Sequence, residues 1–273
     1  MLKLKLEHEY LRSIALISDT HVGSRFGLCP EKYVSVEEDT IAPNRGQRQI
    51  LESFRDYSRR MRDDFKIDTV FLVGDMMAGL NIKEFGVFMK TTDMNEQVEM
   101  ATQVLNILCK GKRVAVWSGT PYHEARDFRI HQLLADNLGG KFYGSISNMR
   151  LEPTSKIVNV AHATTQAMVY PETVLSRDIL FLKEGEALGK LYKTSAIIRG
   201  HRHSYVEIHK SDLHYISLPC WEAFTPYYKA TQWYFKFQPD IGGALMMVDV
   251  KERLRFMHFL YPCPKIADRL VSG

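Results

Sequence analysis

Short apolar runs alternate with longer segments of helical periodicity along the first two thirds of the chain. Each run is mostly apolar on both faces, which is typical of strands covered on both sides by other layers. We predict strands of this kind at 13–18, 68–74, 113–119, 156–161 and 195–200. Because helical segments separate these strands, the pattern indicates an α/β protein.

Three of the intervening segments carry helix signals. The first contains a single apolar stripe formed by Ile50, Phe54, Tyr57, Met61 and Phe65. A second helix is predicted around Gln97–Cys109, and a third from Pro171, a favoured first helical position, to about Gly189.

After Gly200 the pattern becomes rich in short strands. They are predicted near 204–208, 213–218, 243–250 and 253–260. These late strands suggest a second sheet. No repeat, low-complexity tract or Gly/Ser linker divides the chain, so we interpret residues 1–273 as one domain.

Composition narrows the class of protein. The chain is 45% hydrophobic and 25% charged, as in an ordinary soluble globular protein. Its four cysteines stand singly, which favours buried reduced thiols. Residues 1–10 have the pattern of an amphipathic strand, not of a signal peptide, and no run approaches the roughly 18 apolar residues of a membrane helix. We therefore expect a cytoplasmic protein without a membrane partner. The net charge of +4 is compatible with a phosphate-bearing substrate.

Aspartate or histidine follows each of the five apolar runs. In chain order these residues are Asp19 and His21, then Asp75, then His123, then His162, and finally His201 and His203. Half of the chain's ten histidines are in this set. Sites in α/β proteins form where strands end at their carboxyl edge, so neighbouring strands would bring these side chains together.

Such a set has more ligands than one tetrahedral zinc ion needs. It suits two divalent metal ions about 3.5–4 Å apart, bridged by a carboxylate and a hydroxide. Mixed imidazole and carboxylate ligands fit Mn, Fe, Zn, Co or Ni better than Mg or Ca. We predict two divalent ions, with manganese as the first choice.

The motifs resemble those of the calcineurin-like metallophosphoesterase family, whose pattern is D-x-H, G-D, G-N-H-[DE], a lone His and G-H-x-H. Here they stand as Asp19-Thr20-His21, Gly74-Asp75, His123-Glu124, His162 and Gly200-His201-Arg202-His203. The resemblance implies an α/β fold that is a four-layer α/β/β/α sandwich of two mixed sheets, with the late strands in the second sheet. The roles it implies are one metal held by Asp19, His21 and His203, a bridging Asp75, and a second metal held by His162 and His201.

The resemblance also implies a mechanism. A metal-bridging hydroxide would attack phosphorus in line while the metals offset charge on the phosphoryl oxygens. His123 would be the catalytic residue that donates a proton or hydrogen bond to the leaving oxygen. Arg202 lies between two ligands and is a candidate for binding the substrate phosphate.

The third motif departs from the family pattern, because GTPYHE at 119–124 lacks the metal-binding asparagine. One alignment places Thr120 at that position and another places Tyr122 there. A neutral phenol is a poor ligand for a divalent cation, so we favour the Thr120 hydroxyl or carbonyl, or else water. Asn44 or Asn81 could supply an amide from a neighbouring loop. The second metal would then bind more weakly.

The second motif bears on the substrate. Ser/Thr protein phosphatases of the family have G-D-x-V-D-R-G, whereas this chain has Gly74-Asp75-Met76-Met77-Ala78-Gly79. The missing Asp and Arg argue against a protein phosphatase and favour phosphodiesters, with a nucleic acid (as for a nuclease) or a nucleotide as candidate substrates. The alternatives are a small-molecule phosphomonoesterase and a catalytically impaired metal-binding scaffold.

Three further features bear on nucleic acid. Arginines share one face of the first helix, at Arg48, Arg55, Arg59 and Arg62. Residues 219–237 are rich in aromatics that could stack bases, and the insertion at 22–46 leaves directly from a metal-bearing strand end. The simpler interpretations are a solvated helix face and aromatics packed in a core or a subunit interface.

Overall fold

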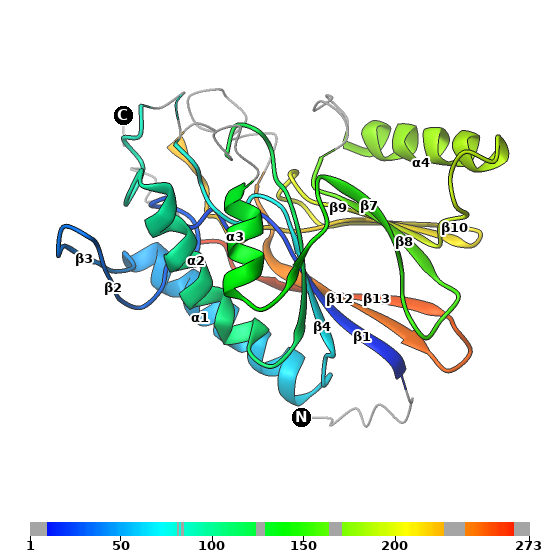
Figure 1. Ribbon diagram of the computed structural model, residues 1–273, viewed down its shortest axis with the longest axis horizontal. Helices are drawn as coiled ribbons and strands as arrows, with labels where there is room; N and C mark the ends of the chain where they lie inside the picture. The colour runs from blue at the N-terminus through cyan, green and yellow to red at the C-terminus, as the bar shows by residue number, and fades with distance from the viewer. Residues whose placement is uncertain are drawn as a thin grey trace, which may run out of the picture.

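Two β-sheets packed face to face form the centre of the molecule, and helices cover their outer faces (Figure 1). The structure, a computed structural model, describes residues 10–80, 82, 85–123, 129–163, 171–226 and 238–264. Most of the predicted strand over residues 1–10 lies outside these ranges.

The first sheet has six strands in the described part of the chain. Their order is β13 (Leu254–Tyr261), β12 (Ile241–Asp249), β1 (Tyr10–Ile17), β4 (Thr69–Val73), β5 (Arg113–Trp117) and β6 (Lys141–Phe142). Strands β1, β4, β5 and β6 are parallel, whereas β12 is antiparallel to both of its neighbours. The sheet is therefore mixed, with β1 at its centre.

The second sheet has five strands within the described ranges. Their order is β10 (Val206–Lys210), β11 (Leu213–Ser217), β9 (Ala196–Arg199), β8 (Ile157–Ala161) and β7 (Ile146–Arg150). The three inner strands are parallel, and the two outer strands are antiparallel to them. Two short strands, β2 (Tyr33–Val34) and β3 (Thr40–Ile41), pair separately within the predicted insertion.

Three buried layers of apolar side chains hold this arrangement together. Between the sheets, Leu16 and Phe71 from the first pack against Val160 and Ile198 from the second. On the outside of the first sheet lie α1 (Arg45–Asp63), α2 (Met94–Cys109) and α3 (Arg129–Asn137). On the outside of the second sheet lies α4 (Pro171–Ala187), whose Ile179 packs toward that sheet. The predicted α/β/β/α sandwich of two mixed sheets is confirmed.

Helix α1 shows how the sequence sets one of these layers. Asn44 caps the helix: its side chain accepts from the Gln47 amide, and the Gln47 side chain accepts from the Asn44 amide, a reciprocal capping box. The predicted stripe is confirmed as far as Met61, which is buried. Phe65 lies beyond the last helical residue, Asp63, but still packs against Phe259.

The late strands divide between the two sheets. The prediction that they form the second sheet holds for β10 and β11 but is wrong for β12 and β13, which extend the first sheet beside β1. The reason is burial, because all nine residues of β12 are buried, as an internal strand requires. From the helix layer, the Tyr57 hydroxyl donates to the Ala244 carbonyl at 2.7 Å and fixes α1 over this strand.

No helix within the described ranges combines the length and apolar character needed to cross a bilayer.

Candidate metal centre

The carboxyl ends of β1, β4, β5, β8 and β9 meet at one edge of the sandwich, where the two sheets adjoin. Backbone hydrogen bonds fix the segments that leave these strands. The Asp19 amide donates to the Gly74 carbonyl at 3.1 Å, joining the β1 and β4 ends. The Gly200 amide donates to the His162 carbonyl at 3.0 Å, joining the β9 and β8 ends. The predicted convergence of strand ends is therefore present.

Five side chains of the site are carried on left-handed backbone. The φ angles are 53° at Asp19, 42° at His21, 50° at Asp75, 69° at His201 and 52° at His203. Such a conformation costs on the order of 1–3 kcal/mol at a non-glycine residue, and it concentrates at functional sites. The surrounding structure therefore holds these residues at a cost in folding free energy.

The Asp19 carboxylate lies at the centre of one half of the site and is 0% exposed. Its Oδ2 accepts from the Ser18 hydroxyl at 2.5 Å and from the His201 amide at 2.9 Å. Its Oδ1 is 3.2 Å from His203 Nε2 and 3.6 Å from His21 Nε2. One carboxylate oxygen is thus anchored by the protein, while the other faces three imidazole nitrogens, since His162 Nε2 also lies 3.5 Å from it.

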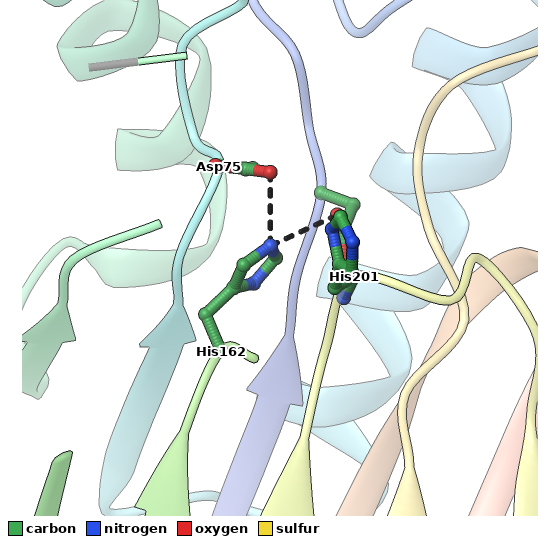
Figure 2. A group of neighbouring side chains, drawn as sticks. Asp75, His162 and His201 are labelled. Atoms are coloured by element: carbon green, nitrogen blue, oxygen red, sulfur yellow. Dashed lines mark hydrogen bonds and ion pairs between the residues drawn. The ribbon is translucent and has the colours of Figure 1, made fainter. Parts of the chain in front are cut away.

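Figure 2 shows that His162 points toward Asp75, and its ring also lies near the Asp19 carboxylate. Its Nδ1 is 2.7 Å from the Val73 carbonyl, so a proton on Nδ1 is donated there. Its Nε2 then lies 2.9 Å from Asp75 Oδ2 and 3.5 Å from Asp19 Oδ1. Holding one ring nitrogen by a carbonyl and leaving the other toward carboxylates is the arrangement of a metal-ligating histidine.

Charges in this buried group shift one another's pKa values. Burial by itself raises the pKa of the Asp75 carboxyl, but His162 and His123 outweigh burial and hold that pKa below its usual value. Burial lowers the pKa of His162, yet the carboxylates of Asp75 and Asp19 outweigh it and raise that pKa to about 9. The carboxylates are therefore ionised at neutral pH and attract a cation.

Among the described residues, the potential ligand atoms form three overlapping groups, within each of which all atoms lie within 4.8 Å of one another. The groups are Asp19, Asp75, His162 and His201; Asp19, His21 and His203; and His21, Asp75 and His123. Every predicted aspartate and histidine of the site belongs to at least one group. Imidazole nitrogens and carboxylate oxygens in this mixture fit Mn, Fe, Zn, Co or Ni.

Glycines make room for this packing. A Cβ on Gly119 would lie 1.9 Å from Asp75 Oδ1, and a Cβ on Gly74 would lie 2.4 Å from the His162 ring. Gly74 also has a φ of 72°, which favours glycine. Both glycines thus allow the backbone to approach the Asp75–His162 pair.

The backbone amide and the hydroxyl of Thr120 both donate hydrogen bonds to Asp75. Its amide lies 2.7 Å from Asp75 Oδ1, and its hydroxyl lies 3.2 Å from Oδ2. Its carbonyl accepts from the His123 amide at 3.0 Å, which shapes the turn. Asn44 caps α1 instead of approaching the site, and Asn81 lies outside the described residues. Metal ligation by Thr120 stays a prediction.

His123 is half-buried beside the ligand groups. Its Nδ1 lies 2.6 Å from the Ala78 carbonyl, and its Nε2 lies 3.9 Å from Asp75 Oδ2. Its ring meets that of His21 edge-on at a centroid separation of 4.5 Å. The anchored Nδ1 leaves Nε2 as the atom directed at the site. Glu124 lies outside the described residues.

Arg202 is half-buried, and its amide donates to the Gly200 carbonyl at 2.9 Å. Its contact with phosphate stays a prediction.

The predicted arginine face of α1 is largely ion-paired. Arg55 pairs with Glu31 and Glu52, and the side chains of Arg59 and Arg62 pair with Asp56 and Asp63 respectively. Within the aromatic segment, Trp221 and Phe224 are buried, and Trp221 packs in the core beneath α1; residues 227–237 lie outside the described ranges. These contacts favour structural roles for the described members of both sets.

The structure adds one acidic residue that the sequence interpretation missed. Glu222 is buried, and its Oε2 lies 3.8 Å from His21 Nε2. It follows β11, another strand that is parallel to β9 and ends at the same edge. The sequence feature that could have predicted this residue is a carboxylate five residues after the predicted strand, separated from that strand by Leu218-Pro219-Cys220-Trp221.

Neither a protein-family model nor a curated protein matches this sequence. Among solved structures, the chain is similar to an archaeal phosphodiesterase with 13% identity and a TM-score of 0.45, over 90% of this chain and 99% of that chain. It is also similar to a predicted phosphoesterase from Streptococcus pneumoniae, with 11% identity and a TM-score of 0.38, over 92% and 93% of the two chains. A zinc complex of Vps29 from Entamoeba histolytica has 11% identity and a TM-score of 0.39, over 91% of this chain and 98% of that chain. Similarity at this level concerns the fold and carries no argument about activity.

Proposed function

We propose that this protein is a metal-dependent phosphoester hydrolase that uses two divalent metal ions and acts on phosphodiesters. The observation that carries the proposal is the overlap of the three ligand groups, which share Asp19, His21 and Asp75. Groups that share members define adjacent positions for cations, as a dinuclear site requires.

The ligands divide as follows. Asp19, His21 and His203 would hold one ion, His162 and His201 would hold the other, and Asp75 would bridge them. When bound, two such ions activate water and offset negative charge on the phosphoryl oxygens. Manganese fits this donor set, in agreement with the mixture of nitrogen and oxygen ligands.

The protein's own contribution lies in orientation and proton transfer. Thr120 donates to both Asp75 oxygens and so fixes the plane of that carboxylate. His123 would deliver a proton from Nε2 to the leaving oxygen, because its Nδ1 is held by the Ala78 carbonyl. Arg202 is proposed as a contact for a non-bridging phosphoryl oxygen.

The preference for diesters is supported by the backbone after Asp75. Position 79 would carry the arginine of a protein phosphatase, but a Cβ on Gly79 would lie 2.4 Å from the His123 carbonyl oxygen. The turn therefore excludes any side chain there. A nucleic acid or a nucleotide is the proposed substrate class.

The test compares hydrolysis of bis-p-nitrophenyl phosphate and p-nitrophenyl phosphate by metal-stripped protein titrated with Mn²⁺. We expect activity that depends on Mn²⁺ and a higher kcat/KM for the diester. A higher value for the monoester would contradict the proposed substrate class. No hydrolysis of either ester by protein that binds Mn²⁺ would contradict the enzymatic function itself. Single-stranded DNA, duplex DNA and cyclic nucleotides would then be compared under the same conditions.

A further inference from the structure

Backbone hydrogen bonds on either side of Glu222 join its segment to the candidate metal centre. The Trp221 amide donates to the Asp19 carbonyl at 3.0 Å, and the Ala223 amide donates to the Phe26 carbonyl at 2.9 Å. The Cys220 thiol also donates to the Glu222 carbonyl at 3.3 Å. These bonds join the segment after β11 to the loop after β1 that carries Asp19 and His21. The position of the Glu222 side chain is therefore coupled to the ligands.

The Glu222 carboxylate is buried, and among the described residues no Lys or Arg forms an ion pair with it. Its side chain is 9% exposed, and among the described residues its ion-pair neighbour is His21, at 3.8 Å. Burial of a carboxylate is unfavourable unless a cation or hydrogen bonds offset it. An imidazole that binds a metal through Nε2 is neutral and offsets little of this charge, so in the metal-bound protein the cations in the adjacent ligand groups would offset it.

We propose, building on the proposed function, that Glu222 is a specificity-determining residue whose charge favours a phosphodiester over a phosphomonoester in this site. It lies on the side of His21, whose ring also meets that of His123, the proposed proton donor. In this proposal, the leaving group lies on the same side of the site as the Glu222 carboxylate.

The reason is the charge balance. Two divalent ions would bring four positive charges, of which Asp19, Asp75 and Glu222 would offset three. A diester phosphate has a single negative charge, whereas a monoester is a dianion near pH 8. Little net positive charge remains to attract the second negative charge of the monoester, and Glu222 repels that charge.

The experiment measures binding of inorganic phosphate, a dianion, by isothermal titration calorimetry at pH 8 on protein loaded with Mn²⁺. Metal content is verified by elemental analysis, and folding by circular dichroism. The variants are Glu222→Gln, which removes the charge, and Glu222→Asp, which keeps it. Glu52→Gln on α1 is the matched control, because it changes the net charge equally on an exposed surface.

Glu222→Gln is expected to bind phosphate about tenfold more tightly and to lower the diester-to-monoester ratio of kcat/KM by a similar factor. Glu222→Asp and Glu52→Gln should stay near the wild-type values. Unchanged phosphate affinity in Glu222→Gln would overturn the inference, as would an equal change in Glu52→Gln. If Glu222→Gln misfolds, Glu222→Asp still tests the inference: because this variant keeps the charge, phosphate binding about tenfold tighter than in the wild type would overturn it.

Failure of the proposed function is separable from failure of this inference. Wild-type protein that binds Mn²⁺ and phosphate but hydrolyses neither ester would contradict the enzymatic function, and the phosphate titration would still decide the role of Glu222. Wild-type protein that binds no Mn²⁺ would overturn both.

Discussion

The two ends of the first sheet both carry buried or half-buried carboxylates, but their partners differ. Before β4, Asp68 is 2.9 Å from the Arg12 guanidinium and 2.7 Å from that of Arg113. At the opposite end, Asp19 and Asp75 are surrounded by imidazoles. Their described ion-pair neighbours are histidines, at separations from 2.9 to 3.9 Å.

This difference separates an end with permanent ion pairs from an end whose side chains could bind cations. Guanidinium is always charged and donates in a fixed fork, so Asp68 is permanently neutralised by its neighbours. Imidazole can lose its proton and bind a metal through the freed nitrogen. The carboxylates at the histidine end can therefore exchange their partners for cations, whereas Asp68 cannot without breaking ion pairs.

The largest expected effect is that of Asp75→Ala. Asp75 belongs to two of the three ligand groups, so its removal should release both metals and lower kcat by about a thousandfold or more. Elemental analysis of the purified variant, beside a hydrolysis assay, measures both consequences. Full occupancy by two metals would contradict the bridging role of Asp75. Asp68→Asn, at the arginine end, is the matched control and should keep both metals.

His123→Ala should separate catalysis from metal binding. If His123 donates the proton to the leaving oxygen, kcat for the diester should fall by about a hundredfold to a thousandfold. The metal content should stay at the wild-type value, because the other two ligand groups do not include His123. A diester with a better leaving group needs less protonation, so it should lose less activity in the variant. Equal losses for good and poor leaving groups would refute proton donation by His123.

At the arginine end, Asp68→Asn should change stability instead of activity. The variant loses its charge-assisted bonds to Arg12, whose side chain is only 8% exposed, and we expect a loss of about 2 kcal/mol in the free energy of unfolding. Urea unfolding measures this value. Metal content and kcat should not change. A loss of metals in this variant would contradict the conclusion that the arginine end of the sheet takes no part in metal binding.

The effect of Asp68→Asn on the free energy of unfolding should also depend on pH. Burial raises the pKa of Asp68, but the hydrogen bonds from Arg12, Thr69 and the Ser13 amide, with the charge of Arg12, together outweigh burial and lower that pKa below the usual value. A lowered pKa in the folded state stabilises the protein above the unfolded pKa of about 3.9, and this stabilisation is lost as the pH falls below it. The difference in unfolding free energy between wild type and Asp68→Asn should therefore shrink between about pH 5 and pH 3. A constant difference over that interval would contradict the ion-pair explanation.

The sequence predicted site residues where an aspartate or histidine closely follows an apolar strand. Asp19, Asp75 and His162 come directly after, or within two residues of, apolar strands, so the rule that sites form at carboxyl ends predicts that they meet, and in the structure they lie together. Glu222 follows its strand at a greater distance and has no motif, so only the folded chain brings it to His21. The assignment of β12 to the first sheet was likewise missed, because apolar runs alone do not specify which strands become neighbours.

The smallest expected effect concerns the loop in which the family's asparagine is missing. In the structure, the Thr120 hydroxyl donates to Asp75, and Thr120 contributes no carboxamide to the site. Thr120→Asn keeps the backbone amide bond to Asp75 and places an amide oxygen near the His162 half of the centre. We expect the more weakly bound Mn²⁺ to bind about tenfold more tightly, as judged by calorimetric titration of metal-free protein. Thr120→Val, which has similar volume and no added ligand, is the control. Equal Mn²⁺ affinity in wild type and Thr120→Asn would show that the missing asparagine does not limit binding of the second metal. A difference in metal affinity between the two halves of the centre would then need another cause.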